Sequence, residues 1–87
     1  MDYEVEVSHE GHDYMVYADL YEEASFSRGK DGAGREWLEV GTDPEFGGWV
    51  VYRYDDNNDL IELKSWDVQV RKKAERIMTE IYWDRVE

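Results

Sequence analysis

The segment Ser65–Val86, SWDVQVRKKAERIMTEIYWDRV, is the one long stretch of the 87-residue chain with a helical hydrophobic period. On a helical wheel, one third of the circumference collects the apolar side chains Val70, Ala74, Ile77, Met78 and Ile81. The pattern predicts an amphipathic helix over 65–86, with Ser65 as its N-cap and Asp67 in its first turn. Its apolar stripe must be buried against the preceding part of the chain.

The chain before this helix has the alternating pattern of β-strands. Tyr3, Val5 and Val7 alternate with polar residues, which predicts a strand with one face in water. Strands are predicted over 3–8, 13–21, 35–40 and 49–54. Residues 60–63 are either a short fifth strand or the lead into the helix, and the glycine-rich segment 22–34 predicts a long mobile connection.

These elements predict an α+β fold in a single domain that spans residues 1–87. We expect an antiparallel β-meander of four or five strands within an acidic region, 1–63, and a C-terminal helix, 65–86, packed on one sheet face. The other face is then left open to water. The alternation places these residues on it: Glu4, Glu6, Tyr17, Asp19, Trp37 and Glu39.

The formal net charge of −12 is distributed unevenly along the chain. Residues 64–87 carry six basic and five acidic side chains, whereas residues 1–63 carry four basic and 17 acidic ones, a net charge of −13. Such a surface repels nucleic acid and membrane headgroups and attracts basic partners, with a strong dependence on salt. The alternative is that the acidic surface serves only to keep a small protein soluble.

The composition also predicts where the protein works. There is no cysteine for a disulfide or a thiolate metal site, which indicates a reducing compartment. The N-terminus MDYEVEV lacks the basic start and apolar core of a signal peptide, and no stretch reaches membrane-spanning length. We expect a cytoplasmic protein without membrane contact.

Histidine and carboxylate side chains gather around the first predicted turn. His9, His12 and Asp13 are residue types that hold divalent metals, but their spacing is not HExxH and they lie on a turn. We therefore expect solvent-exposed turn residues, and a metal-dependent enzyme built on the two histidines is the weakest of the alternatives. No other part of the chain carries a catalytic signature, so the sequence predicts a protein without enzymatic activity, cofactor or metal.

An acidic sheet face can compete with nucleic acid for a basic surface. Residues two apart on a strand are about 6.8 Å apart and neighbouring strands about 4.8 Å. Outward carboxylates therefore form a dense array of negative charge, and interleaved Tyr17, Trp37 and Trp49 are candidate apolar anchors. The predicted partner-binding residues are Glu4, Glu6, Tyr17, Asp19, Trp37, Glu39, Asp43, Glu45, Asp55, Asp56 and Trp83.

Trp83 supports a second hypothesis. It falls opposite the apolar stripe of the helix, so a loop covers its indole or a partner does. In the second case the chain is a small structural or assembly module that docks through its helix and Trp83.

The chain resembles the small, acidic, cysteine-free proteins encoded by phages and mobile elements, among them anti-CRISPR proteins, several of which mimic nucleic acid. The resemblance lies in MDYEVEVSHEGHDYMVYADLYEE, in GGWVVYRYDDNND and in the final amphipathic helix. It implies an inhibitor in the cytoplasm of a bacterial host cell. Such an inhibitor binds a basic surface of a nucleic-acid-binding defence complex of the CRISPR-Cas type, performs no chemistry and does not bind nucleic acid itself.

Overall fold

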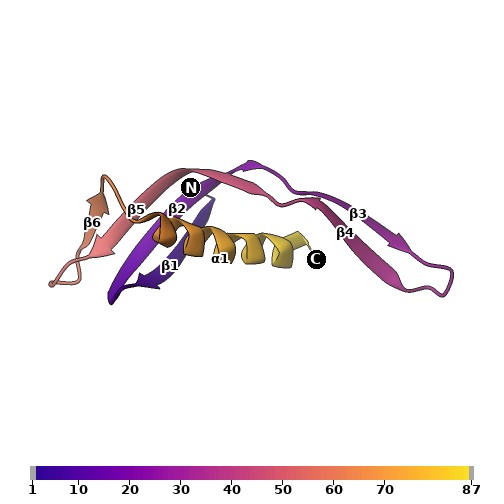
Figure 1. Cartoon of the computed structure of the whole chain (residues 1–87), viewed down its shortest axis with the longest axis horizontal. Coiled ribbons are helices and arrows are strands. Elements are labelled where there is room, and N and C mark those ends of the chain that lie inside the picture. Colours follow the sequence, from indigo (N-terminus) through magenta and orange to yellow (C-terminus); the bar gives the residue numbers. More distant parts are fainter. Residues whose placement is uncertain (1, 87) are drawn as a thin grey trace.

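The computed structural model describes residues 2–86, which form two antiparallel sheets and a C-terminal helix (Figure 1). The elements are β1 (Tyr3–His9), β2 (His12–Glu22), β3 (Ser25–Lys30), β4 (Glu36–Thr42), β5 (Glu45–Tyr54), β6 (Leu60–Leu63) and α1 (Val68–Val86). The main sheet has the strand order β1-β2-β5-β6, and β3 pairs with β4 alone to form a hairpin that we call the arm. The predicted α+β class with a packed C-terminal helix is confirmed, and residues 60–63 form a strand.

The arm corrects two predictions. Residues 22–34 are not one mobile connection, because they include β3, and the predicted strand over 35–40 pairs with β3 and does not join the main sheet. The Asp31 carboxylate closes the hairpin by accepting the N–H groups of Ala33 and Arg35, each at 2.9 Å. Gly34 takes a φ of 81°, which favours glycine.

Strand β5 begins earlier than its apolar run indicated. It starts at Glu45 and passes through both Gly47 and Gly48, whereas the sequence predicted a start at Trp49. Its pairing with β2 shifts register twice, and Gly48, at a φ of 65°, lies in the first irregularity. Such bulges bend a strand pair and increase its twist. The β2–β5 ribbon therefore curves across the helix before it continues into the arm.

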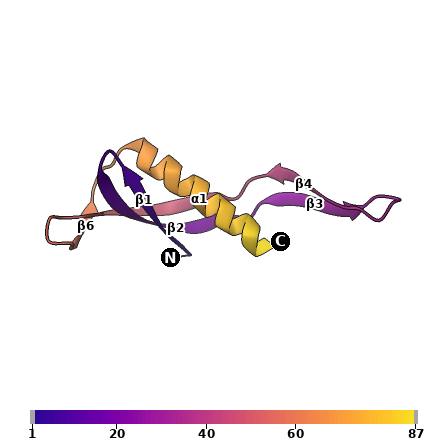
Figure 2. The same cartoon turned by 90° about the horizontal axis from the view of Figure 1, so that it is seen from below.

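The arm makes the molecule long. Its principal extents are 59 × 22 × 19 Å, and its radius of gyration is 16.6 Å. A compact domain of this length has a radius of gyration of about 12 Å. Figure 2 shows the cause, because β3 and β4 extend beyond the end of α1 while the rest of the chain stays around the helix.

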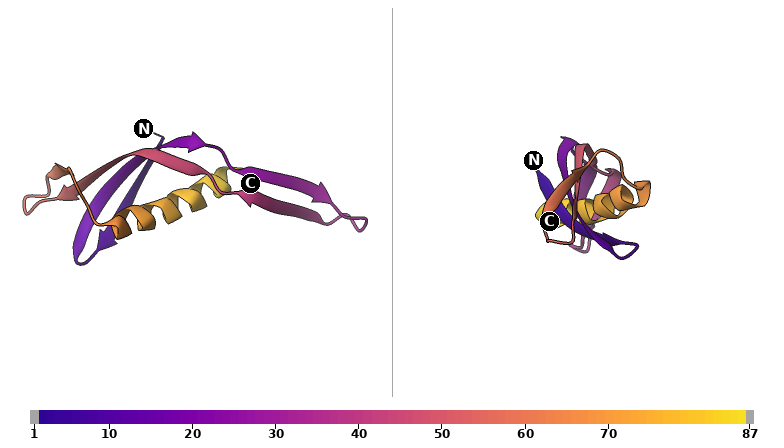
Figure 3. Two further views of the ribbon diagram at one scale, coloured as in Figure 1. Left: turned by 45° about the horizontal axis from the view of Figure 1, so that its top comes forward. Right: turned by 90° about the vertical axis from the view of Figure 1, so that its left-hand side faces the viewer.

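The core lies between α1 and one face of the main sheet (Figure 3). The helix buries Val70, Ala74, Met78 and Tyr82, and the sheet buries Tyr3, Val5, Val7, Val16, Ala18 and Val51. The predicted stripe is thus the packed one, with Ile77 and Ile81 half-buried at its edges.

Asp67, and not Ser65, caps α1. Its carboxylate accepts the Gln69 N–H at 2.8 Å, and its carbonyl accepts the Val70 N–H at 3.0 Å. The hydrogen bond from the backbone N–H of Gln69 lowers the pKa of Asp67 below 3.8. Burial partly opposes this shift, and the nearby His9 and Lys73 lower the pKa further. Only the ionised carboxylate makes the full set of these interactions.

Asp67→Ala should lower the midpoint of thermal unfolding by several degrees at neutral pH, because the cap is lost. A folded-state pKa below the unfolded value of 3.8 means that the charge contributes stability above pH 3.8 and loses it as the pH falls through the lowered pKa. The difference between wild type and Asp67→Ala should therefore shrink in this acidic range. Asp67→Asn is the control, since asparagine also caps helices but does not titrate. Circular dichroism melts across pH 2–7 check this, and a constant difference would refute it.

Candidate functional site

The face of the main sheet that points away from α1 is called the open face here. Its residues alternate along each strand with the buried ones, and their cross-strand pairs follow the sheet register. They are Glu4, Glu6, Ser8, Asp13, Met15, Tyr17, Asp19, Tyr21, Val50, Tyr52, Tyr54, Leu60 and Glu62. The centre of this face is aromatic and apolar, and glutamates stand on both outer strands.

Two rows of paired residues cross the open face. In one row Glu4 of β1 pairs with Tyr17 of β2, which pairs with Val50 of β5. In the other, the order is Glu6, Met15, Tyr52 and Glu62. Directly opposed residues on neighbouring strands lie about 5 Å apart. Each central tyrosine therefore has a glutamate as an immediate cross-strand neighbour.

The two central tyrosines also contact each other. The ring centroids of Tyr17 and Tyr52 are 5.5 Å apart, and the planes are at 84°, which is an edge-to-face contact. Burial raises the pKa of the Tyr17 phenol above 10.0, and the charge of the Glu4 carboxylate raises it further, as do the neighbouring Tyr52 and Tyr54 phenols at the high pH where they ionise. The Tyr17 phenol is thus neutral at physiological pH, and it lies near the Glu4 carboxylate and the rings of Tyr52 and Tyr54.

The structure concentrates the acid on the main sheet. The sheet with its turns, residues 2–24 and 43–63, holds 14 acidic side chains and one basic one, Arg53. The arm, residues 25–42, holds three of each sign. The net charge of −13 that the sequence placed before the helix therefore belongs to the main sheet, and the arm is neutral.

Four of the predicted partner-binding residues meet on the open face. Glu4, Glu6 and Tyr17 are neighbours in the two rows, and Asp19 follows Tyr17 on the same side of β2. The Asp19 carboxylate accepts the Asp2 N–H at 3.0 Å, so it also anchors the start of the chain.

Trp37 and Glu39 do not lie on the open face, as the sequence predicted, but on the arm. The reason is that β4 pairs with β3 and never reaches the main sheet. The Trp37 ring crosses the hairpin over Gly29, where an added Cβ would come within 2.3 Å of it. Trp49 is on the main sheet but packs toward the helix, with the Arg71 guanidinium 5.9 Å from its ring centre.

The remaining acidic candidates lie in turns. Asp43 and Glu45 stand where the arm joins the main sheet, on either side of the buried Pro44. Asp55 closes the β5–β6 turn by accepting the N–H groups of Asn57 and Asp59 at 2.8 and 2.9 Å, and Asp56 is exposed at its tip. None of these four carboxylates joins the two rows of the open face.

Trp83 is covered by the base of the arm. Its ring contacts the rings of Phe26 and Tyr82, with centroids 5.6 and 5.5 Å away, and its N–H donates to Asp43 at 3.3 Å. The Arg28 guanidinium donates to the carbonyl of Val86 at 2.6 Å, at the end of the same helix. We call this group the joint, because it fixes the arm to α1.

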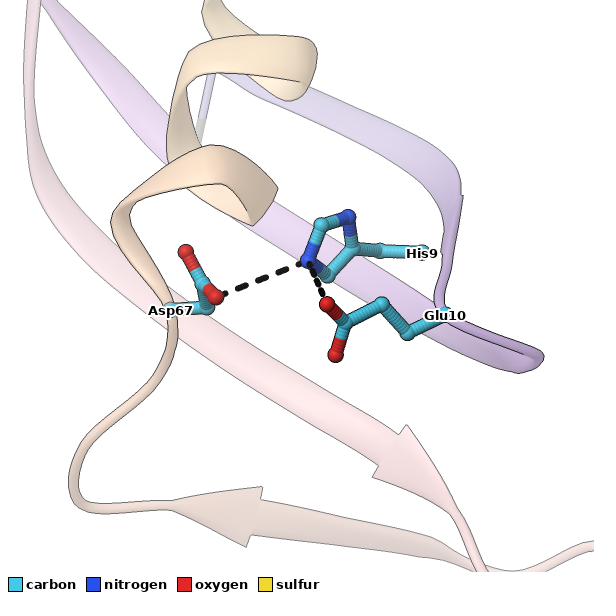
Figure 4. A group of neighbouring side chains, drawn as sticks. All are labelled: His9, Glu10 and Asp67. Carbon is cyan, nitrogen blue, oxygen red and sulfur yellow. Dashed lines mark ion pairs between the residues drawn. The ribbon is translucent and has the colours of Figure 1, made fainter.

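His9 does not combine with His12 and Asp13 but lies beside Glu10 and Asp67, whose carboxylates are 3.8 and 3.5 Å from its Nε2 (Figure 4). The Lys73 ammonium is 3.1 Å from the other ring nitrogen, Nδ1. An ammonium group can only donate, so Nδ1 accepts in this contact, while Nε2 faces the two carboxylates. The cluster ties the β1–β2 turn to the start of α1.

The sequence analysis did not predict most of the open face as a binding surface. The residues it left out are Ser8, Asp13, Met15, Tyr21, Val50, Tyr52, Tyr54, Leu60 and Glu62. The run WVVYRY shows the alternation of Val50, Tyr52 and Tyr54, but their position beside Tyr17 depends on the pairing of β2 with β5. The arm separates β2 from β5 in the sequence, and no local pattern indicates that these two strands pair.

Comparison of the chain with protein-family models, with curated proteins and with solved structures finds no match. Among residues 2–86, no helix has both the length and the apolar character needed to cross a membrane.

Proposed function

We propose that this protein is a non-enzymatic inhibitor, encoded by a phage or another mobile element. It binds a basic nucleic-acid-binding surface of a bacterial defence complex of the CRISPR-Cas type and thereby excludes nucleic acid. The observation that supports the proposal is the net charge of −13 on the main sheet, one face of which α1 leaves uncovered.

The acidic sheet matches the chemistry of such a target. Proteins that grip nucleic acid carry lysine and arginine at positions that neutralise phosphates. Glu4 and Glu6 on β1 and Glu62 on β6 stand on opposite sides of the apolar centre. Because the sheet already fixes the strands that carry these glutamates, binding does not have to order a flexible backbone. The tyrosines between them add apolar contact area, which phosphate lacks and which favours one target over every basic surface.

Neutralising the rim of the open face tests the proposal. Glu4→Gln, Glu6→Gln and Glu62→Gln in one chain should weaken binding to the target by roughly tenfold or more at physiological salt, because each charge faces a cation of the partner. The control changes Glu23, Glu39 and Glu80 to glutamine, which removes the same charge from exposed positions outside the open face. Binding of the control should stay within about threefold of wild type.

The target is found by using wild type and both variants as baits in a nuclease-treated bacterial lysate. The proposal requires that the protein retained by wild type binds nucleic acid, that added nucleic acid displaces it and that raised salt releases it. If the retained protein does not bind nucleic acid, or if the rim variant retains it as well as the control does, the mimic mechanism is wrong.

A further inference from the structure

We propose that the open face selects arginine over lysine, through two units in which a tyrosine ring stands beside a glutamate. The units are Glu4 with Tyr17 and Glu62 with Tyr52. The occupant is an arginine-bearing segment of the partner protein. The kind of partner rests on the proposed function, but the preference for arginine rests on the geometry of this face alone.

The units are built from direct cross-strand pairs. Glu4 opposes Tyr17 across β1 and β2, and Glu62 opposes Tyr52 across β5 and β6. The two rings touch edge to face in the middle, so the two carboxylates stand on the outer sides of one aromatic pair. The Cβ atoms of each tyrosine and its opposed glutamate are about 5 Å apart, so a cation on either ring has a glutamate side chain beside it.

Arginine uses both parts of such a unit. Its planar guanidinium stacks on an aromatic face and donates in parallel to a carboxylate, and it loses its hydration more readily than an ammonium does. A lysine ammonium can be attracted by the same charges, but it is a compact point charge without the planar fork. The total charge of the face therefore attracts both arginine and lysine, whereas the ring-carboxylate units bind arginine more tightly than lysine.

The chain already pairs arginines with its aromatic rings at three other places. Arg28 lies over Phe26, Arg71 over Trp49 and Arg85 over Tyr3, with guanidinium carbons 5.4, 5.9 and 4.9 Å from the ring centres. The open face includes no basic residue, and within residues 2–86 no such contact is found on its tyrosines. The rings and glutamates of the open face thus lack a cation of this chain, unlike the rings of Phe26, Trp49 and Tyr3.

The probes are two capped, unstructured peptides of equal length and charge, one with arginine and the other with lysine at alternate positions between glycines. Wild type should bind the arginine peptide about tenfold more tightly than the lysine peptide at one salt concentration, as two cation–π contacts allow. Titration calorimetry gives both affinities, and NMR should show the largest shifts for the ring protons of Tyr17 and Tyr52.

Two matched double variants separate the rings from the charge. Tyr17→Leu with Tyr52→Leu keeps the net charge and an apolar side chain, and should reduce the preference to about twofold or less, while Tyr17→Phe with Tyr52→Phe should keep it. Unfolding melts establish that both are folded. Equal affinity of wild type for the two peptides, or a preference that survives the leucine variant, would overturn the inference.

The outcome is independent of the target search. If the preference is found but no nucleic-acid-binding protein is retained, the proposed function fails and the arginine site stands. If such a protein is retained but the two peptides bind equally, the mimic remains and this inference fails.

Discussion

Met78→Ala should lower the free energy of unfolding by about 2–5 kcal/mol, one of the two largest effects expected for this chain. Met78 is 0% exposed and is among the largest fully buried side chains of the described residues. A domain of this size has a total stability of roughly 4–13 kcal/mol. The core is a single layer between one helix and one sheet, so few other contacts are present to compensate for the cavity.

Val68→Ala is the matched control on the same helix. Its side chain is 47% exposed, so its truncation should change the stability by less than about 0.5 kcal/mol. Urea unfolding followed by circular dichroism measures both changes. If Met78→Ala cost no more than Val68→Ala, α1 would not pack on the main sheet through its Val70–Tyr82 stripe.

Trp83→Ala should destabilise the protein by roughly 2–3 kcal/mol, less than for a fully buried tryptophan because the indole is half-buried. The loss should be largest in the arm, since the Trp83 ring contacts Phe26 and its N–H donates a hydrogen bond to Asp43 at the joint. An isolated two-stranded hairpin is marginal in water. Hydrogen exchange should therefore show reduced protection of the amides of β3 and β4, with a smaller change in β1.

Trp37→Ala is the control for this experiment. It removes an indole of equal size from the arm, where Trp37 is 45% exposed and crosses only the hairpin itself. It should cost less than Trp83→Ala and leave the joint intact. Unchanged exchange in the arm of Trp83→Ala would mean that the joint does not hold it. The hypothesis that Trp83 docks onto a partner would then regain support. Partner binding by Trp83→Ala and by wild type would have to be compared at equal concentrations of folded protein.

The predicted surface residues were placed correctly where alternation along one strand decides the position, and wrongly where pairing with a distant strand decides it. Glu4, Glu6 and Tyr17 were assigned correctly to one face, because a strand alternates its side chains whatever it pairs with. Trp37 and Glu39 were assigned to that face as well, but their strand pairs in the arm. Strand pairing depends on partners distant in the chain, and the bulges at Gly48 and near Tyr21 are invisible in a hydrophobic pattern.

For the helix, too, the sequence indicated some features and not others. Its apolar stripe was evident because Val70, Ala74 and Met78 recur at the helical period. Its start was placed at Ser65 and not after Asp67, since both residue types cap helices and only the backbone geometry decides between them. Trp83 was identified as lying off the stripe, but nothing local showed that the arm would cover it.

The amino-acid sequence by itself determined the α+β class, the amphipathic helix that packs on one side of the sheet and the confinement of the net negative charge to the residues before that helix. Each depends on composition or on a short-range period. The tertiary structure alone decided that β2 pairs with β5 past the projecting arm. That pairing places Tyr17 beside Tyr52 between the glutamates of β1 and β6. The physical reason is that a surface combines residues from several strands, and their register is set by packing and hydrogen bonding across the whole sheet.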